Sequence, residues 1–491
     1  MEALELIRLL RLRGRQPAGD LARLMDISRP TLMRTVRAAG DTVVAQGRAR
    51  RTAYAARRAL RGSMAPLPLY RVGLDGEPRE IGNLHLTVPD GTAVEFEADI
   101  GWPLDADMAD GWFEGLPYPL QDMRPQGFLG RHFARRHAPL LQVSDDPTRW
   151  SDDDALHALS LLGSDTLGDL IVGEAACRLW LDHVSAARNG QAATALSDDA
   201  AVDTYPELAD QALAHGLAGS SAGGEFPKFL ALRTDRSSTT GRETGPETGP
   251  ETGPEAGSDG DTKQASPTER HVLVKFSGSD DAPGTQRWAD LLVCEHLAGE
   301  VLRQRLDVPA AHSRILRSGG RTFLEVDRFD RHGRLGRSGL VSWSAVDGAF
   351  FGSAGRPWPE AERRLVERGW LRRTDAARIE RLWHFGRLIA NTDMHDGNLS
   401  FQPASSRGQD GLVLAPAYDM LPMQDAPLRG MELPASAWSP SLPLPSERPA
   451  WEPAAVAAQA FWETAASDAR ISPGYRALCA SRADALRRIV G

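Results

Sequence analysis

The sequence predicts an α+β protein of several domains, in which a small basic head precedes an acidic body. The chain has 491 residues, too many for one simple domain, and 41% of them are hydrophobic, enough for several cores. Residues 1–62 contain 14 arginines, no lysine and five acids, so they carry +9, whereas the whole chain carries −9. Within the body, strand-like alternation comes first and helical patterns dominate the C-terminal part.

Composition argues against a membrane-spanning or disulfide-rich protein. No apolar run reaches the roughly 18 residues that a membrane helix requires. The N-terminal segment MEALELIRLLRLRGR is interrupted by arginines, unlike a secretory signal. The three cysteines, Cys177, Cys294 and Cys479, show neither pairing nor zinc spacing. We therefore expect a cytoplasmic protein without membrane contact, and its basic head leaves association with the nucleoid open.

The basic head has the rhythm of a helix-turn-helix. Apolar residues recur at helical spacing, and Ser28 followed by Pro30 marks the start of a second helix. The segment TVVAQGRARRTAYAA then indicates a hairpin with Gly47 and Arg48 at its tip. We predict a winged-helix DNA-binding domain over residues 1–62, and the alternative is a basic helical module that contacts protein.

The second helix of the head is the part expected to read DNA. Such a helix fits the major groove, with its N-terminal residues toward the base edges. Thr35 and Arg37 are expected on its outer faces, together with the residues that we predict to contact DNA. Those predicted contacts, with one at the hairpin tip, are Arg29, Thr31, Arg34 and Arg48.

The acidic body is expected to divide near residue 335. Residues 66–100 alternate apolar and polar positions between Asp-Gly turns, which is typical of strands. Residues 236–268 contain three E-T-G-P units and cannot bury a core, so we expect a disordered loop there. We predict a β-rich subdomain and a small lobe over residues 63–335, followed by a helical large lobe over residues 336–491.

The stretch NTDMHDGNLSF carries the densest set of polar side chains. Asp393 and Asn398 are five residues apart, and Asp419 follows an expected hairpin. This order suits phosphoryl transfer, in which the first Asp accepts a hydroxyl proton while the Asn and the second Asp hold Mg²⁺ on ATP. The D-x-x-x-x-N spacing alone is weak, and capped turns are the alternative; we assign Asn391 and Asp396 to capping and turn geometry.

The preceding half of the body supplies the other parts of a phosphate site. The loop AGSSAGGEFPK, with Gly223 and Gly224, contains small residues that let backbone N–H groups approach phosphate. The strand HVLVKFS carries Lys275, a compact cation suited to phosphate oxygens. The helix that follows offers Asp290 and Glu295 as alternative partners for this lysine, and a later strand, TFLEVDRFDRHG, runs into a segment suited to hold adenine.

These motifs in this order resemble the HipA kinases, serine/threonine protein kinases that act as toxins of type II toxin–antitoxin systems. The resemblance rests on SAGGEFPK, VLVKF, VDRFDR, NTDMHDGNLSF and LAPAYDM and covers roughly residues 66–490. The fused head and GLPYPLQDMRPQGFLGR resemble the YjjJ-like subgroup of that family. The resemblance implies a two-lobed, protein-kinase-like body with ATP and Mg²⁺ as cofactors.

The resemblance also implies roles for single residues. Where the family usually has Asn-Glu at the start of the helix after the lysine strand, this chain has Asp290-Leu291, and its insert at 236–268 lengthens the chain before Lys275. Asp327, Arg328 and Asp330 form a surface ion-pair cluster in the alternative interpretation. The implied roles are catalysis by Asp393 with Asn398, metal binding by Asn398 and Asp419, phosphate contact by Lys275 with His395 beside it, a hinge from Asp327 to Phe329, and autophosphorylation of Ser221 or its neighbour Ser220.

The function that follows is an ATP-dependent serine/threonine kinase of the HipA toxin type, with a DNA-binding head for autoregulation or chromosomal targeting. Relatives phosphorylate aminoacyl-tRNA synthetases, so such an enzyme is a candidate substrate, and a separate antitoxin is a candidate partner. One alternative is a DNA-binding transcription regulator whose kinase-like body binds nucleotide without turnover. Another is a kinase of a small molecule or a nucleic acid.

Overall fold

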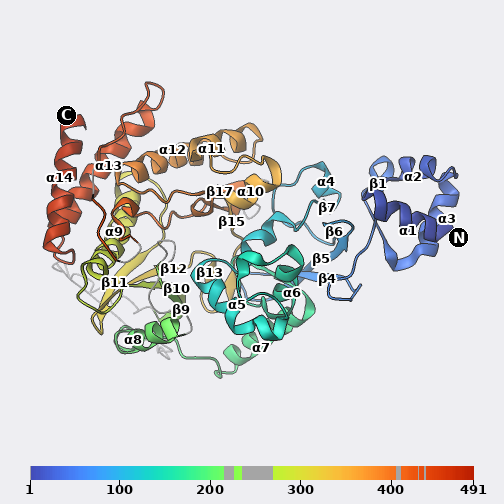
Figure 1. Cartoon of the computed structure of the whole chain (residues 1–491), viewed down its shortest axis with the longest axis horizontal. Coiled ribbons are helices and arrows are strands. Elements are labelled where there is room, and N and C mark those ends of the chain that lie inside the picture. The colour runs from blue at the N-terminus through green and yellow to red at the C-terminus, as the bar shows by residue number, and fades with distance from the viewer. Residues whose placement is uncertain are drawn as a thin grey trace, which may run out of the picture.

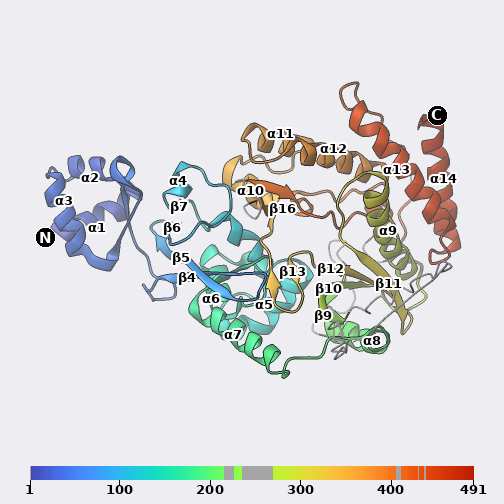
Figure 2. The same cartoon turned by 180° about the vertical axis from the view of Figure 1, so that it is seen from behind.

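The computed structural model describes residues 2–214, 226–234, 269–404, 411–428, 431–435 and 438–490. The molecule is elongated, with the N-terminal head at one end and the helices α13 and α14 at the other (Figure 1). The view from behind shows the middle part of the chain between these ends (Figure 2). Helices and strands are mixed in each large part, so the predicted α+β class is confirmed.

The head combines three helices with a small antiparallel sheet. In the order β1-β3-β2, Gln16 pairs with Tyr54 and Val43 pairs with Ala56. Ser28 caps α3 by accepting a hydrogen bond from the Thr31 N–H at 3.3 Å. The elements are α1 (Glu2–Arg13), β1 (Gln16–Pro17), α2 (Ala18–Leu24), α3 (Arg29–Ala39), β2 (Val43–Gln46) and β3 (Ala53–Ala56).

The middle part of the chain is a five-stranded antiparallel sheet with helices packed beside it. The strand order is β7-β6-β5-β4-β8, so the last strand in sequence closes the edge next to the first. Its core includes Leu84 and Val94, which are fully buried. The elements are β4 (Leu67–Val72), β5 (Pro78–Thr87), β6 (Gly91–Phe96), α4 (Ala106–Ala109), β7 (Trp112–Phe113), η3 (Tyr118–Met123), α5 (Gly127–Leu141), α6 (Asp152–Leu162), β8 (Leu170–Val172) and α7 (Glu174–Arg188).

The head is docked on the middle part rather than tethered to it. Buried Val44 and Ala55 of the head form one apolar cluster with Ala93 and Trp112 of the middle sheet. The Arg15 guanidinium lies 2.6 Å from the Asp107 carboxylate across the same junction. Apolar burial and the ion pair together fix the orientation of the head.

The part that carries Lys275 is a four-stranded antiparallel sheet in the order β11-β12-β10-β9. Helix α8 packs an apolar face, with Tyr205 at its centre, against this sheet. Helix α9 is buried over most of its length and contacts both the sheet and α13. The elements are α8 (Asp198–Ala214), β9 (Lys228–Thr234), β10 (Glu269–Phe276), α9 (Pro283–Arg305), β11 (Ser313–Ser318) and β12 (Arg321–Asp327).

The C-terminal part is mostly helical and holds a three-stranded sheet, β15-β16-β17, near its centre. Phe401 pairs with Leu414, so a hairpin precedes Asp419. Among the described residues, no helix is both long and apolar enough to cross a membrane. The elements are β13 (Arg331–His332), β14 (Gly336–Arg337), β15 (Val341–Ser342), α10 (Trp343–Phe350), α11 (Trp358–Glu367), α12 (Arg373–Leu388), η5 (Asp396–Asn398), β16 (Ser400–Pro403), β17 (Leu412–Leu414), α13 (Arg448–Ser467) and α14 (Pro473–Val490).

One buried carboxylate in this part should make stability depend on pH. Burial, and then the neighbouring Glu380, raise the pKa of Glu362 on α11 to about 7. Its stabilising neutral form is therefore populated at low pH, and stability falls as pH rises from about 4.5 to 7. We expect Glu362→Gln to raise the free energy of unfolding by ~1 kcal/mol at pH 8 and to leave it unchanged at pH 4.5.

Thermal unfolding at the two pH values measures this difference. Glu360→Gln is the matched control, because the Glu360 carboxylate on the same helix is paired with Arg356 at 2.9 Å, and its pKa is lowered by that hydrogen bond. It should not stabilise the protein at pH 8. An equal gain for Glu362→Gln at both pH values would contradict the titration argument.

Candidate active site

Lys275 lies at the centre of the candidate site, on the inner strand β10. Its ammonium contacts both oxygens of Glu295, at 2.7 and 2.8 Å, and also a carboxylate oxygen of Asp419. Burial alone would lower the pKa of Lys275, but Asp419 and Glu295 outweigh it and raise the pKa. The lysine therefore stays charged and joins the sheet, helix α9 and the segment after the hairpin.

The structure chooses between the two acidic partners that the sequence left open. Glu295 is 7% exposed and faces Lys275, and burial raises its pKa more than the lysine lowers it. Asp290 instead accepts hydrogen bonds from Ser472, from the N–H at 2.8 Å and from the hydroxyl at 2.6 Å. Glu295 is thus the partner of the lysine, and Asp290 holds the turn before α14.

The loop after α12 is fixed by amide side chains. Asn391 accepts a hydrogen bond from the Asp393 N–H at 3.0 Å and donates to the Asp419 carbonyl at 3.3 Å. Asn398 donates from its amide to the Asp393 carbonyl at 2.9 Å. These bonds place Asp393, Asn398 and Asp419 in one region, with the Asp393 side chain exposed. Asp396 accepts from the Gly355 N–H at 2.9 Å and so holds a neighbouring turn.

Asp419 has an unusual backbone conformation, with φ at +53°. Non-glycine residues seldom adopt this region, and those that do are often at functional sites. Burial would raise the pKa of its carboxyl, but Lys275, Lys228 and His395 together outweigh burial and lower it. The Asp419 carboxylate is therefore ionised and near His395, whose Nδ1 accepts a hydrogen bond from the Gly397 N–H at 3.0 Å.

Comparison with known proteins identifies the family. Residues 220–482 match the HipA-like C-terminal domain, and residues 63–181 match the middle domain of the YjjJ-like toxins. The chain is 36% identical over 481 residues to Toxin YjjJ of Escherichia coli strain K12, which covers 98% of this chain and 97% of that protein. The chain belongs to the HipA-like toxins. The family predicted from the sequence motifs is thereby confirmed.

A solved structure shows the same fold. The Shewanella oneidensis MR-1 HipA, in its complex with HipB and operator DNA, superposes with a TM-score of 0.50. The match covers 86% of this chain and 96% of that chain at 16% sequence identity, so it speaks for the fold alone. The body of the chain is accordingly HipA-like.

The segment predicted as a hinge, from Asp327 to Phe329, is strongly restrained. The N–H groups of Asp327 and Arg328 donate to the carbonyls of His312 and His271, at 2.8 and 3.0 Å, and the Asp327 carboxylate pairs with Arg270. The Phe329 ring lies 6.0 Å from that of Tyr418, measured between centroids. The Phe329 carbonyl accepts only a long hydrogen bond, from Gln402 at 3.5 Å, so the Phe329 backbone is the candidate in this segment for contact with adenine, whereas the Asp327 side chain is used elsewhere.

The alternative interpretation of this segment needs a correction. Arg328 and Asp330 do form ion pairs, at 3.0 Å, but the cluster is buried and not at the surface. Asp330 is 2% exposed and Arg331 is 8% exposed. The cluster is buried because the middle domain covers it, which the sequence did not indicate.

The small-residue loop with Gly223, Gly224, Ser220 and Ser221 lies outside the described residues. Phe226, the first residue described after it, stacks edge-on against Trp288 at 4.6 Å between centroids. The Lys275 Nζ is 5.9 Å from the centroid of the Phe226 ring. The chain therefore emerges from this loop beside the lysine.

In the head of this HipA-like protein, α3 exposes most of the side chains expected to contact DNA. Arg29 and Arg34 are exposed, and Thr31 is half-buried beneath them. Arg48 is exposed in the turn between β2 and β3, which is longer than the tip expected from the sequence. Thr35 is buried, and its hydroxyl donates to the Thr31 carbonyl at 3.0 Å. The outer position expected for Thr35 is therefore wrong.

Two residues of the site escaped the sequence interpretation. Asn391 bridges Asp393 and Asp419, although its place in the N-T-D stretch suggested only a turn. Tyr418 donates its hydroxyl proton to the Gly397 carbonyl at 2.7 Å and fixes the residue before Asp419. Asn391 is two residues from Asp393, and Tyr418 is next to Asp419. This closeness in the sequence was the available signal, because residues beside candidate catalytic groups often position those groups.

Proposed function

We propose that this HipA-like toxin is an ATP- and Mg²⁺-dependent serine/threonine protein kinase with a DNA-binding head. The observation that carries the proposal is Lys275, held between Glu295 and Asp419 beside the loop from Asp393 to Asn398. A lysine paired with a helix glutamate, a D-x-x-x-x-N loop and a following aspartate are the parts that kinases use to position ATP.

The donor set at the site fits magnesium. Asn398 uses its amide nitrogen on the Asp393 carbonyl, so its side-chain oxygen is available as a ligand, and Asp419 supplies a carboxylate. Within the described part of the chain, no group of three or more His, Cys, Asp or Glu side chains is placed to hold a metal. The two oxygens of Asn398 and Asp419 suit Mg²⁺, which commonly uses one or two protein oxygens together with phosphates and water. When bound, the ion would neutralise charge on the ATP phosphates.

In this proposal each protein group has a separate task. Asp393 accepts the proton of the substrate hydroxyl, and its exposed position lets a polypeptide reach it. Lys275 turns from Asp419 toward the ATP phosphates while Glu295 keeps it in place. The Phe329 backbone contacts adenine beside Asp327, and His395 lies near the phosphates.

The remaining proposed contacts involve the small-residue loop. The N–H groups of Gly223 and Gly224 would cradle phosphate, because the lysine lies near the point where the chain leaves this loop. Ser221, or its neighbour Ser220, would accept a phosphate from the same site. The added charge of roughly −2 would oppose the return of the loop to the nucleotide phosphates.

Incubation with γ-labelled ATP tests the proposal. We expect label on the protein with Mg²⁺ and none with EDTA, and phosphopeptide mass spectrometry should place it on Ser220 or Ser221. A protein that binds ATP without labelling itself, a panel of aminoacyl-tRNA synthetases or a generic protein substrate would favour a transcription regulator instead. Transfer to a small molecule or a nucleic acid alone would contradict the protein-kinase assignment.

The basic head supports a DNA-binding role. Four of its arginines pair with acids of the middle part, whereas the arginines of α3, together with Arg48 and Arg50 of the β2–β3 turn, are exposed to solvent. The Shewanella HipA structure contains HipB and operator DNA, so DNA and a separate antitoxin are candidate partners here. The paired arginines are Arg15, Arg51, Arg58 and Arg61.

Arg34→Ala should weaken DNA binding about tenfold and reduce the salt dependence by about one phosphate contact. The probes are a duplex from upstream of the coding sequence and a random duplex of the same length, titrated at several salt concentrations. Arg61→Ala removes the same charge at the junction, where Arg61 pairs with Asp154, and should bind like the wild type. Equal losses for both variants would mean that only net charge matters, and would contradict a specific role for α3.

A further inference from the structure

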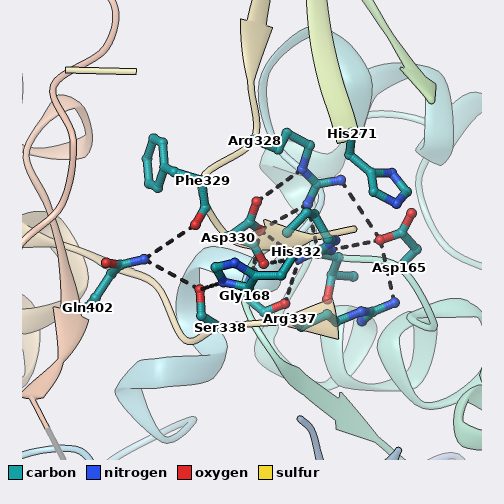
Figure 3. A network of polar contacts seen from close by, with 12 residues as sticks. Asp165, Gly168, His271, Arg328, Phe329, Asp330, His332, Arg337, Ser338 and Gln402 are labelled. Carbon is teal, nitrogen blue, oxygen red and sulfur yellow. Dashed lines mark hydrogen bonds and ion pairs between the residues drawn. The ribbon is translucent and has the colours of Figure 1, made fainter. Parts of the chain in front are cut away.

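A loop of the middle domain, residues 164–168, binds residues 328–337 at the end of the predicted hinge through ion pairs and hydrogen bonds (Figure 3). The Asp165 carboxylate lies 2.7 Å from Arg331, 3.5 Å from Arg337 and 3.9 Å from Arg328. Partial burial would raise its pKa, but the three guanidinium groups outweigh that and lower it. Asp165 is thus an anion at the junction of two domains.

The backbone of the same loop adds hydrogen bonds to these ion pairs. The Gly168 N–H donates to the Asp330 carboxylate at 3.0 Å, and Arg331 donates to the Gly168 carbonyl at 2.9 Å. The Ser164 carbonyl accepts from Arg337 at 2.6 Å. Asp330 is next to Phe329 in the chain, so these contacts fix the end of the proposed adenine hinge.

The charges of this cluster are not balanced. Arg328, Arg331 and Arg337 face two carboxylates, those of Asp165 and Asp330. Burial, and then Arg331, lower the pKa of Arg337 to about 9, and its guanidinium is stacked 3.9 Å from the Trp180 ring centroid of the middle domain. Removing Asp165 would leave Asp330 as the one described carboxylate in ion-pair contact with these guanidinium groups, because nearby Asp169 pairs with Arg71 at 3.6 Å. The resulting repulsion would loosen the segment.

A second carboxylate of the middle domain holds the other half of the site. Asp122, on η3, accepts from the Ser342 N–H at 2.5 Å and from the Ser342 hydroxyl at 2.7 Å. The next residue, Trp343, donates its N–H to the Leu399 carbonyl at 2.7 Å. Leu399 directly follows Asn398, so the position of this metal-binding candidate depends on Ser342 and on Asp122.

This connection continues to Asp419. Ser342 is opposite Ser400 in the β15–β16 ladder, and the Ser400 hydroxyl is 2.7 Å from that of Tyr418. Tyr418 uses its single proton on the Gly397 carbonyl, so the serine must be the donor. The loop and the residue before Asp419 are thereby joined behind the site.

We propose that the middle domain positions both halves of the nucleotide site: Asp165 sets the hinge and Asp122 sets the catalytic loop. This inference rests on the proposed kinase activity. Neither residue contacts the reacting atoms, so both are positioning residues. Loss of Asp165 should act on nucleotide binding, whereas loss of Asp122 should act on the chemical step.

Steady-state kinetics with two variants test the inference. Asp165→Asn should raise the KM for ATP about fivefold to tenfold and leave kcat within about twofold. Asp122→Ala should lower kcat about tenfold and leave the KM for ATP within about twofold. Each variant serves as the control for the other, and Asp153→Asn, which removes a middle-domain carboxylate that pairs with Arg58 of the head, should change neither constant.

Asp165 is a better target than Asp330, because half of its side chain is exposed and its variant should fold. Circular dichroism and melting temperature check folding, and calorimetric titration with a non-hydrolysable ATP analogue measures binding separately. Parallel losses of kcat and affinity in both variants, or no change in either, would overturn the inference. A wild type that binds the analogue but transfers no phosphate would overturn the kinase activity, and the Asp165 effect would still be read from the dissociation constant. A wild type that binds no nucleotide would overturn both.

Discussion

Replacing Asp393 with alanine should lower phosphate transfer by roughly 10²–10⁴-fold, the usual contribution of a positioned general base. The affinity for ATP should hardly change, because the Asp393 side chain is exposed and makes no contact with Lys275 or Asp419. The backbone of the loop is held by Asn391 and Asn398 and does not depend on the missing carboxylate. Initial rates of labelling, measured together with the dissociation constant of an ATP analogue, separate the two effects.

Asp396→Asn is the matched control for this prediction. Asp396 lies three residues further along the same loop and accepts a hydrogen bond from the Gly355 N–H. An asparagine oxygen can still accept that bond, so the variant should transfer phosphate within about threefold of the wild type. If Asp393→Ala retained more than a tenth of wild-type activity, Asp393 would not be the base.

The candidate catalytic groups could be named from the sequence because they lie in short, ordered motifs. Asp393 and Asn398 belong to one loop, and the paired strands β16 and β17 precede Asp419. Local spacing determines such positions, and the family is confirmed over nearly the whole chain. The roles of the single residues remain predictions that the kinetic variants address.

The partner of Lys275 could not be chosen from the sequence. Asp290 and Glu295 are five residues apart on one helix, so their side chains point about 140° away from each other. Only the packing of α9 decides which of the two side chains faces the sheet. The partner of Asp290, Ser472, lies 182 positions further along the chain. A decision that depends on tertiary packing has no local signal.

The same reason hid the contacts of the middle domain. Asp165 and Arg331 are 166 positions apart, and Asp122 and Ser342 are 220 apart. In the sequence, the polar segment around Asp330 therefore left a surface ion-pair cluster open as the alternative to a hinge. Burial by a separate domain turned it into an internal ion-pair cluster, whose energetic importance comes from its low-dielectric surroundings.

Replacing Lys275 with methionine should have a second large effect, on stability as well as activity. Lys275 is 4% exposed and pairs with Glu295 and Asp419, so its loss leaves two neighbouring carboxylates that have lost their direct partner and keep only the nearby charge of Lys228. Breaking a buried ion pair in this way typically costs ~3–5 kcal/mol. We expect chemical denaturation to show such a loss at pH 7.5 and phosphate transfer to fall at least about a hundredfold.

A second substitution separates the two roles of the lysine. In Lys275→Met, the unpaired carboxylates have raised pKa values, so the stability deficit should shrink as pH falls toward 5 and grow as pH rises. Adding Glu295→Gln removes one of the two carboxylates that lost their lysine partner. The double variant should regain roughly half of the lost stability without regaining activity. Recovery of activity in the double variant would mean that the lysine only neutralises Glu295. Continued inactivity with recovered stability would show that the ammonium of Lys275 itself is needed at the phosphates, and that the nearby charge of Lys228 does not replace it.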